Sequence, residues 1–319
     1  MRALCTFVWI YAMYEITPLL DDPIRNLKTI RDVFRWAISE MESAQLSYGH
    51  GCPNSWEEAS FLVCRGLKLP FEHFDVFMDA TLTQSELSRL VHLIDRRVHE
   101  KTPVPYLLKE AWLTEHMFYI DERALIPRSY IAELIEEDFA PWIENPDAIH
   151  SVLDMCTGSG CLAILAQGIF PNAKVLGADL SADALEVAKI NRRDYGLEET
   201  LELVQSDLFS SLEGRRFDLI ISNPPYVTEA AMQALPAEYR HEPAMALGAG
   251  EDGMDIVRRM LPEARHHLNA GGLLIVEVGD GAAAVEAAFP GLELTWLVTS
   301  GGDDQVFLVT CEALNAYFG

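Results

Sequence analysis

The sequence is poor in basic residues and in cysteine, and it has no long hydrophobic run. Lys and Arg total 24 against 49 for Asp and Glu, so the formal net charge is −25 at pH 7. A surface of that charge repels phosphate backbones, which argues against general nucleic-acid binding and favours a basic protein partner. Half of the residues are hydrophobic and 23% are charged, so a globally disordered chain is excluded.

The 319 residues contain six cysteines, too few for the disulfide framework of a secreted protein, and no two form a C-x-x-C pair. A zinc site or a thioredoxin-like motif therefore has little support. Cys156 and Cys161 are interpreted as small buried hydrophobes. The nine histidines show neither triad nor metal-ligand spacing, so no metal is expected. Together these features predict a protein of the reducing cytoplasm.

The first fourteen residues, MRALCTFVWIYAMY, are apolar and aromatic. They are too short for a membrane span, which needs about 20 residues. They resemble a signal peptide only superficially, because no A-x-A cleavage site follows and Asp21-Asp22 come soon after. Two alternatives stay open: the segment docks on the helical domain, or it extends the chain upstream of a natural start near Met13. We expect neither a membrane association nor a functional residue there.

The N-terminal third has the pattern of a helical domain. Residues 24 to 46 carry apolar side chains at helical spacing and predict one amphipathic helix. Ser55 with Glu58, and Thr83 with Glu86, form capping boxes before apolar runs. We expect residues 1–107 to form a helical domain. A hairpin linker is expected over residues 108–128, with AWLTEHMFYI (111–120) extended.

From residue 151 onward, apolar strand-like runs alternate with helical ones. The strands are predicted in SVLDMC, AKVLGAD, FDLIIS and GLLIVEV, and one helix is predicted over 181–195, between Ser181 as its cap and Gly196. This alternation predicts an α/β domain over residues 129–319, with a parallel sheet covered by helices on both faces. The closing runs LELTWLV and QVFLVT indicate an antiparallel pair at a sheet edge.

Three successive strand ends carry an acid. DMCTGSG (154–160) follows the first strand and opens a helix, where glycines allow close backbone approach and the helix N-terminus offers free N–H groups. Asp179 ends the next strand and can accept both ribose hydroxyls of a nucleoside. Ser206-Asp207-Leu208 follows the third strand, where adenine edges are typically read. Together they favour a nucleoside-bearing cofactor over three unrelated caps or turns, although the loop is neither G-x-G-x-x-G nor a P-loop. The candidate cofactor-binding residues are Asp154, Thr157, Gly158, Ser159, Gly160, Asp179, Leu180, Asp207, Leu208 and Asn223.

Asn223-Pro224-Pro225-Tyr226 directly follows the fourth strand. Two successive prolines make a stiff loop without two N–H groups, and Pro225 holds Pro224 extended. The Pro224 carbonyl and the Asn223 side-chain carbonyl are two acceptors, and Tyr226 adds a flat face. This set suits a planar NH₂ group as its target. Asn223, Pro224, Pro225 and Tyr226 are therefore the candidate catalytic residues.

D-x-x-x-G-x-G together with NPPY resembles the class I S-adenosylmethionine-dependent methyltransferases that modify planar amino groups. Ala124-Leu125-Ile126-Pro127-Arg128, and Tyr239-Arg240-His241-Glu242-Pro243 after NPPY, resemble the protein glutamine N5-methyltransferase branch of that family. The match covers most of the chain from about residue 20 to 310. It implies a Rossmann-like fold with a seven-stranded, mostly parallel sheet and an N-terminal helical domain that docks the substrate. It also implies S-adenosyl-L-methionine as cofactor.

Within that branch, Pro53-Asn54-Ser55-Trp56-Glu57-Glu58-Ala59 and Tyr119-Ile120-Asp121-Glu122-Arg123 resemble enzymes that methylate ribosomal protein L-three. The implied partner is that basic protein, free or during ribosome assembly, with no direct binding of DNA. Release factors modified at their GGQ loop remain an alternative substrate. A nucleic-acid amino-methyltransferase would share NPPY, but a target-recognition domain and a basic net charge are absent. A non-catalytic scaffold would have no use for an intact NPPY.

Three further residues or pairs are candidates for a functional role. His266-His267 is interpreted as part of a solvated face. Roles for His241 near the substrate and for Glu277 on the fifth strand stay open. No strong base is required, because the amide nitrogen becomes acidic once it is methylated.

Overall fold

The computed structural model describes residues 18–319, so the apolar segment at residues 1–14 lies outside them. The chain divides into two compact units. One is helical and, among the described residues, spans 18–46 and 54–100; the other comprises Ser47–Pro53 and Lys101–Gly319. Over the described range, every helix is too short or too polar to cross a membrane.

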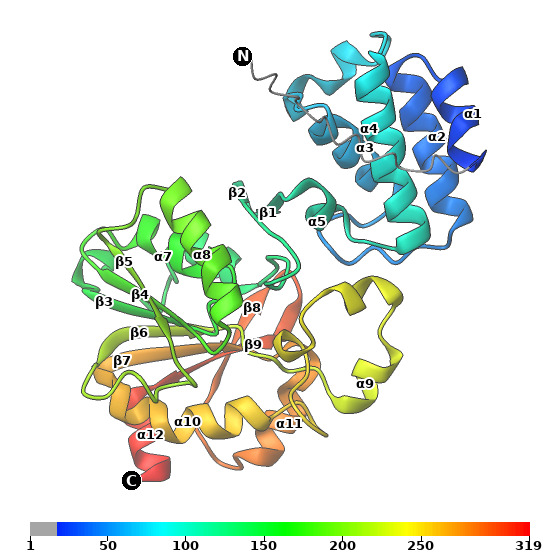
Figure 1. Cartoon of the computed structure of the whole chain (residues 1–319). Helices are drawn as coiled ribbons and strands as arrows, with labels where there is room; N and C mark the ends of the chain where they lie inside the picture. Colours follow the sequence, from blue (N-terminus) through cyan, green and yellow to red (C-terminus); the bar gives the residue numbers. More distant parts are fainter. Residues whose placement is uncertain (1–17) are drawn as a thin grey trace, which may run out of the picture. The chain divides into compact units, whose positions relative to one another are not determined.

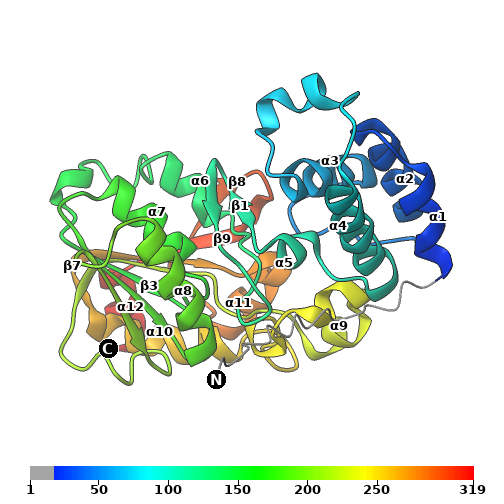
Figure 2. The ribbon, with the colours of Figure 1, turned by 45° about the horizontal axis from the view of Figure 1, so that its top comes forward.

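In its described part, the helical unit has four α-helices (Figure 2). These are α1 (Pro18–Asn26), α2 (Ile30–Ser43), α3 (Ser55–Gly66) and α4 (Gln84–Asp95), with the short helices η1 (Phe71–Phe77) and η2 (Arg96–Glu100). Of the four, α2, α3 and α4 bury apolar faces against one another. Its core includes Val33, Phe34, Ala37, Met41, Ala59, Leu62, Leu90 and Ile94. Glu58 of α3 and Arg97 of η2 are buried as an ion pair, with Oε1 2.5 Å from Nε. Each charge supplies the partner that the other needs inside the protein.

Of the three predictions made for the helices of this unit, one is confirmed and two are wrong. The capping box of Thr83 and Glu86 is present at the start of α4, which confirms that prediction. The box predicted at Ser55 is wrong: Asn54 caps α3 by accepting from the Glu57 N–H. The single helix expected over 24–46 is also wrong. The chain there forms the end of α1 and then α2, because Thr29 begins a new helix with its own capping box.

The second unit contains a small hairpin and a large sheet. The hairpin is β1 (Ala111–Leu113) with β2 (His116–Phe118), within the extended segment predicted at 111–120. The seven-stranded sheet has the order β5-β4-β3-β6-β7-β9-β8. Its strands are β3 (Ser151–Met155), β4 (Lys174–Asp179), β5 (Leu201–Gln205), β6 (Phe217–Ser222), β7 (Leu268–Glu277), β8 (Thr295–Thr299) and β9 (Gly302–Thr310). The neighbours from β5 to β7 are parallel, and β9 is antiparallel to β7 and β8, so the α/β fold and the terminal antiparallel pair are confirmed.

Helices cover both faces of this sheet (Figure 1). The α-helices of this unit are α5 (Val104–Leu108), α6 (Ile131–Glu136), α7 (Cys161–Ile169), α8 (Ala182–Asp194), α9 (Glu229–Ala234), α10 (Asp255–His267), α11 (Ala282–Ala288) and α12 (Cys311–Phe318). One core cluster joins the sheet to α6 and α7, and the other joins it to α10, α11 and α12. Val152 and Leu153 of β3 belong to opposite clusters, as do Leu219 and Ile220 of β6. Strands buried on both faces are continuously apolar, which explains why FDLIIS shows little alternation.

The strand order places the candidate residues at one edge of the sheet. The chain proceeds from β3 to β4 and β5 in one direction, then returns to β6 on the other side of β3. In open α/β sheets the crevice at such a reversal, outside the carboxyl ends of the strands, is where ligands bind.

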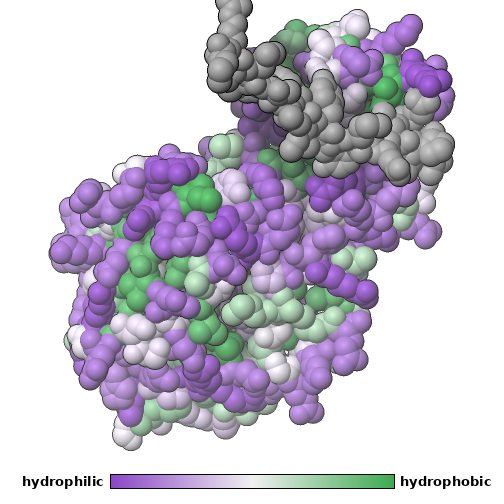
Figure 3. Space-filling model, in the orientation of Figure 1, coloured by the Kyte–Doolittle hydropathy of each residue, from purple (hydrophilic) through white to green (hydrophobic). Residues whose placement is uncertain are grey.

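On the face of this unit seen in Figure 3, hydrophilic residues cover the outer parts and hydrophobic residues gather toward the middle.

Candidate active site

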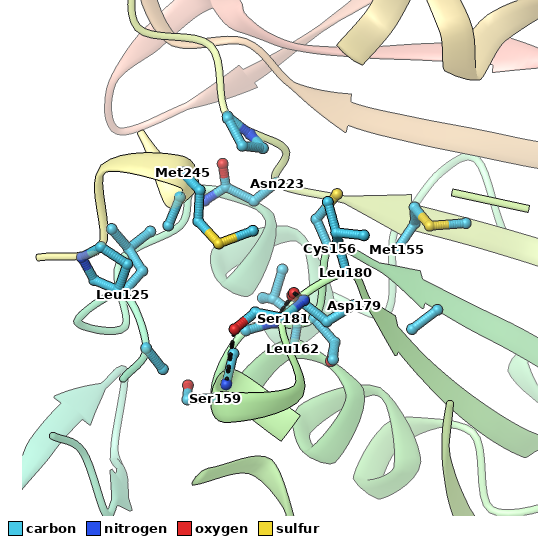
Figure 4. A pocket seen from close by; sticks show the side chains of 18 of the residues that line it. Leu125, Met155, Cys156, Ser159, Leu162, Asp179, Leu180, Ser181, Asn223 and Met245 are labelled. Carbon is cyan, nitrogen blue, oxygen red and sulfur yellow. Dashed lines mark hydrogen bonds between the residues drawn. The ribbon is translucent and has the colours of Figure 1, made fainter. Parts of the chain in front are cut away.

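A pocket that is partly open to solvent lies at the carboxyl ends of β3, β4, β5 and β6 (Figure 4). Of the residues predicted for the site, those that line the pocket are Thr157, Gly158, Ser159, Asp179, Leu180, Asp207, Leu208, Asn223 and Pro225. Asp154, Gly160, Pro224 and Tyr226 are not among its lining residues.

Asp154 binds the loop that forms one wall of the pocket. Its side chain is buried, and Oδ2 accepts from the Thr157 hydroxyl at 2.5 Å and from the Ala163 N–H at 3.0 Å. Burial raises the pKa of Asp154 to about 7, although both hydrogen bonds oppose the rise. Gly160, at φ +80°, lies against Ala188 of α8, where a side chain would crowd it. Asp154 and Gly160 thus shape the loop without lining the pocket themselves.

Asp179 stands at the end of β4 with both carboxylate oxygens engaged by the backbone. Oδ2 accepts from the Gly158 N–H and Oδ1 from the Ser181 N–H, each at 2.8 Å. Burial raises its pKa, against these hydrogen bonds. Each carboxylate oxygen can accept more than one hydrogen bond, so a carboxylate held in this way keeps acceptor capacity for a ligand.

The third strand end combines an exposed acid with a buried apolar residue. Asp207 is exposed and forms an ion pair with Arg259 of α10, with Oδ1 2.8 Å from Nη2. Leu208 is buried at φ +49°, and the Ser206 hydroxyl donates to its carbonyl oxygen at 2.5 Å. Arg259 also lines the pocket, so it provides a cation beside Asp207 that the sequence patterns did not single out.

Asn223 directly follows β6, and its side-chain amide is oriented by the protein. Nδ2 donates to the backbone carbonyl of Arg128 at 3.1 Å. Within the described part of the chain, no hydrogen bond is made to its Oδ1. The amide is therefore fixed by its nitrogen, and the carbonyl oxygen keeps its acceptor capacity. Asn223 and Met245 both line the pocket (Figure 4).

The remaining residues of NPPY have different surroundings. Pro224 is buried and Pro225 lines the pocket. Tyr226 is half-buried, with its ring beside Gly279, where a Cβ would overlap it. Its hydroxyl donates to Glu277 Oε1 at 3.5 Å. Burial, followed by the charge of Glu277, raises the Tyr226 pKa, so the phenol stays protonated.

Two segments complete the pocket beyond the residues predicted for the site. Residues 123–129 form one, and Pro243, Met245 and Ala246 form the other. In the sequence, parts of both regions resemble the protein glutamine N5-methyltransferase branch, but neither was predicted to line the site. What brings the two regions together is the contact of Arg128 with Glu242, more than a hundred positions away. No local sequence pattern predicts such a contact. Among the described residues, no group of His, Cys, Asp and Glu could hold a metal ion.

Glu277 ends β7 among hydrogen-bond donors. Its Oε2 accepts from the Ser129 hydroxyl at 2.5 Å and from the Tyr130 N–H at 2.9 Å. Burial outweighs these bonds and raises the pKa of Glu277 to about 7. The Ser129 hydroxyl also accepts from the Ile131 N–H at the start of α6.

Of the other candidate residues, His241 does not line the pocket. His267 stacks on Phe209, with centroids 4.4 Å apart.

The Glu277 carboxyl predicts a pH dependence of stability. Its folded pKa lies above the ordinary value of 4.5, so the folded state holds the proton more tightly. The free energy of unfolding must then fall as pH rises from 4.5 to 7, by on the order of 3 kcal/mol from this group. Glu277→Gln does not titrate. Its unfolding free energy minus that of the wild type should therefore increase by that amount between pH 4.5 and 8. Urea unfolding of both proteins measures the difference; a pH-independent value contradicts the burial penalty.

Comparison with known proteins gives matches over part and over most of the chain. The family model of the Methyltransferase small domain matches residues 140–239. The ribosomal protein uL3 glutamine methyltransferase of Burkholderia pseudomallei is 51% identical over 299 residues, 92% of this chain and 97% of that protein. The protein of that name from Neisseria meningitidis serogroup A is 47% identical over 296 residues, 93% of this chain and 97% of that protein. A solved methyltransferase structure from Pyrococcus furiosus matches 72% of this chain and 98% of its own, with 17% identity and a TM-score of 0.45.

Proposed function

Because the chain belongs to the family of ribosomal protein uL3 glutamine methyltransferases, we propose that it methylates the side-chain amide nitrogen (N5) of a glutamine in ribosomal protein uL3, with S-adenosylmethionine as donor. The observation that carries the proposal is the orientation of Asn223. Its Nδ2 is bound to the Arg128 carbonyl at the wall of the pocket, so its Oδ1 is the end that can accept from a substrate NH₂.

The residues around the pocket fit a nucleoside-bearing cofactor. Asp179 is held by two backbone N–H groups and still has lone pairs for the two ribose hydroxyls. Thr157, Gly158 and Ser159 would face the amino-acid part of the cofactor, and Asp207 with Leu208 would border its base. When bound, S-adenosylmethionine supplies a methyl group already activated by its positively charged sulfonium.

The chain's own residues act on the acceptor. An amide nitrogen is a poor nucleophile because its lone pair is delocalised into the carbonyl. Hydrogen bonds from the substrate NH₂ to Asn223 Oδ1 and to the Pro224 carbonyl would orient the nitrogen and stabilise the positive charge that grows on it. The contribution is positioning and electrostatics, so neither a nucleophilic side chain nor a strong base is needed.

The choice of substrate requires surfaces beyond NPPY, since an amide site reads any accessible glutamine. We propose that the helical unit docks the substrate. Ribosomal proteins are generally basic because they bind RNA, whereas this chain has a net charge of −25. Opposite charges accelerate encounter and suppress wrong partners.

The test is methyl transfer from labelled cofactor to separately purified uL3, peptide-chain release factor and DNA. We expect label on uL3 alone, and peptide mass spectrometry should locate it on one glutamine. A uL3 variant with that glutamine replaced by Asn, one methylene shorter, is the matched control and should stay unlabelled. Exclusive labelling of the release factor contradicts the proposed substrate. Labelling of DNA alone contradicts the protein substrate and the charge argument together.

The same assay across a salt series tests the role of charge. Raising the ionic strength from about 0.01 M to about 0.15 M shortens the screening length from roughly 30 Å to roughly 8 Å. We therefore expect kcat/KM for uL3 to fall while kcat changes little. A salt-independent kcat/KM would show that long-range attraction does not bring the partners together.

A further inference from the structure

The direction of the Asn223 amide depends on the position of a neighbouring segment, residues 126–130. The acceptor for Asn223 Nδ2 is the backbone carbonyl of Arg128, in the middle of this segment. The two ends of a carboxamide have nearly the same shape and differ in what they can bind. A displaced Arg128 carbonyl would thus release the amide to rotate.

Glu242 holds this segment from one side. It is buried, and its Oε1 accepts from the Ile126 N–H at 3.0 Å and from Arg128 Nη1 at 2.7 Å. Its Oε2 accepts from Arg128 Nη2 at 2.8 Å and lies 3.3 Å from His50 Nε2. The Arg128 guanidinium also lies over the ring of Tyr239, 5.5 Å from its centroid. A bidentate contact between arginine and carboxylate fixes geometry as well as charge.

Glu277 holds the other end of the same segment. It accepts from the Ser129 hydroxyl and from the Tyr130 N–H, the two residues that follow Arg128. The Arg128 carbonyl is thus bracketed by two buried carboxyl groups, one after β6 and one at the end of β7. This arrangement is non-local, because Arg128 and Glu242 are 114 positions apart in the sequence.

We propose that Glu242 is a positioning residue for methyl transfer: it clamps Arg128 so that the Arg128 carbonyl holds Asn223 with its oxygen toward the substrate amide. This inference rests on the proposed function. Burial alone would raise the pKa of Glu242, but hydrogen bonds from His50 and Arg128, with the charge of Arg128, lower it to about 2. The clamp is therefore a carboxylate throughout the working range of pH. Loss of its negative charge or of one acceptor oxygen loosens the guanidinium.

The first measurement is single-turnover methyl transfer by Glu242→Gln with saturating cofactor and uL3. A glutamine keeps the size of the side chain but presents an NH₂ to donors, so we expect a rate lower by about tenfold to a hundredfold, the cost of a small misplacement. Cofactor affinity should change much less, because the Glu242 carboxylate contacts His50, Ile126 and Arg128 and not Asp179. Arg128→Lys is the milder second variant. It retains the charge and the backbone carbonyl but loses the bidentate contact, and its rate should fall in the same direction.

The decisive measurement is a double-mutant cycle with Asn223→Ala. If Glu242 acts through Asn223, Glu242→Gln should have little further effect on the residual rate of the Asn223→Ala protein. Multiplicative losses in the double variant would overturn the proposal, because they mean that Glu242 affects the rate by another route. An unchanged rate for a folded Glu242→Gln protein would overturn it as well.

Asp218→Asn is the matched control. Asp218 lies near the start of β6, at the opposite end of the strand that leads to Asn223. Its carboxylate also accepts several hydrogen bonds, from His150, Ser151 and Asn269. Both substitutions should lower thermal stability. Only Glu242→Gln should also slow methyl transfer, because a loss of stability alone does not change the rate of the folded protein. Failure of the wild type to label uL3 would refute the proposed function. A labelled uL3 with a multiplicative cycle would refute only the clamp.

Discussion

Replacing Asn223 by alanine is expected to lower the rate of methyl transfer by on the order of 10²–10³, the usual loss when one oriented polar group is removed from a reacting centre. Its Nδ2 is bound by the Arg128 carbonyl at 3.1 Å, so the missing function is that of Oδ1 toward the substrate amide. Single-turnover methylation of uL3 with saturating cofactor measures the loss directly. Cofactor affinity should change much less than the rate, because the acid at the end of β4 is untouched.

Asn269→Ala is the matched control for this variant. Asn269 belongs to β7, and its Nδ2 donates to Asp218 at 2.7 Å, at the opposite end of the sheet. Both variants lose one amide and one side-chain hydrogen bond, but only Asn223 lines the pocket. Near-normal turnover by Asn223→Ala would contradict the proposed mechanism even with the fold intact. Equal losses in the two variants would indicate a general effect on the sheet.

The α/β architecture could be predicted from the sequence because its signals are local. The runs SVLDM, KVLGAD and FDLIIS carry consecutive apolar residues rather than alternating ones, which is typical of parallel strands buried on both faces. Ser181 caps α8 as predicted, by accepting from the Ala184 N–H. At Ser55 the local pattern fails. Glu58 is drawn into a buried pair with Arg97, and Asn54 provides the cap instead.

The candidate site shows the same division between local and distant information. The loop after β3, Asp179 and Asn223 could be located from the sequence, because each directly follows a strand and the carboxyl ends of parallel strands meet. The role of Asp154 could not be predicted. The sequence motif D-x-x-x-G-x-G does not tell whether the Asp154 carboxylate faces the ligand or binds Thr157 beneath the loop. The contact of Glu242 with Arg128 depends on chain folding over a long separation, so no spacing rule predicts it.

Replacing Asp179 by alanine is expected to weaken S-adenosylmethionine binding by roughly tenfold to more than a hundredfold. This corresponds to loss of a charged hydrogen-bond acceptor worth about 1.5–3 kcal/mol. The carboxylate also accepts from the Gly158 and Ser181 N–H groups, so its removal affects both the ribose site and the loop beside it. Asp179→Asn keeps the size and one acceptor oxygen, and its affinity should lie between those of the wild type and the alanine variant. Titration calorimetry with the cofactor measures all three.

Asp183→Ala provides the comparison needed to interpret that loss. Asp183 lies in the first turn of α8, four residues after Asp179, and is exposed. Both substitutions remove one negative charge from the same region, so a long-range electrostatic effect would appear in both. We expect only Asp179→Ala to lose affinity, because only Asp179 lines the pocket. Unchanged cofactor binding in a folded Asp179→Ala protein would remove this residue from the site, and similar losses in the two variants would assign the effect to net charge rather than to ribose recognition.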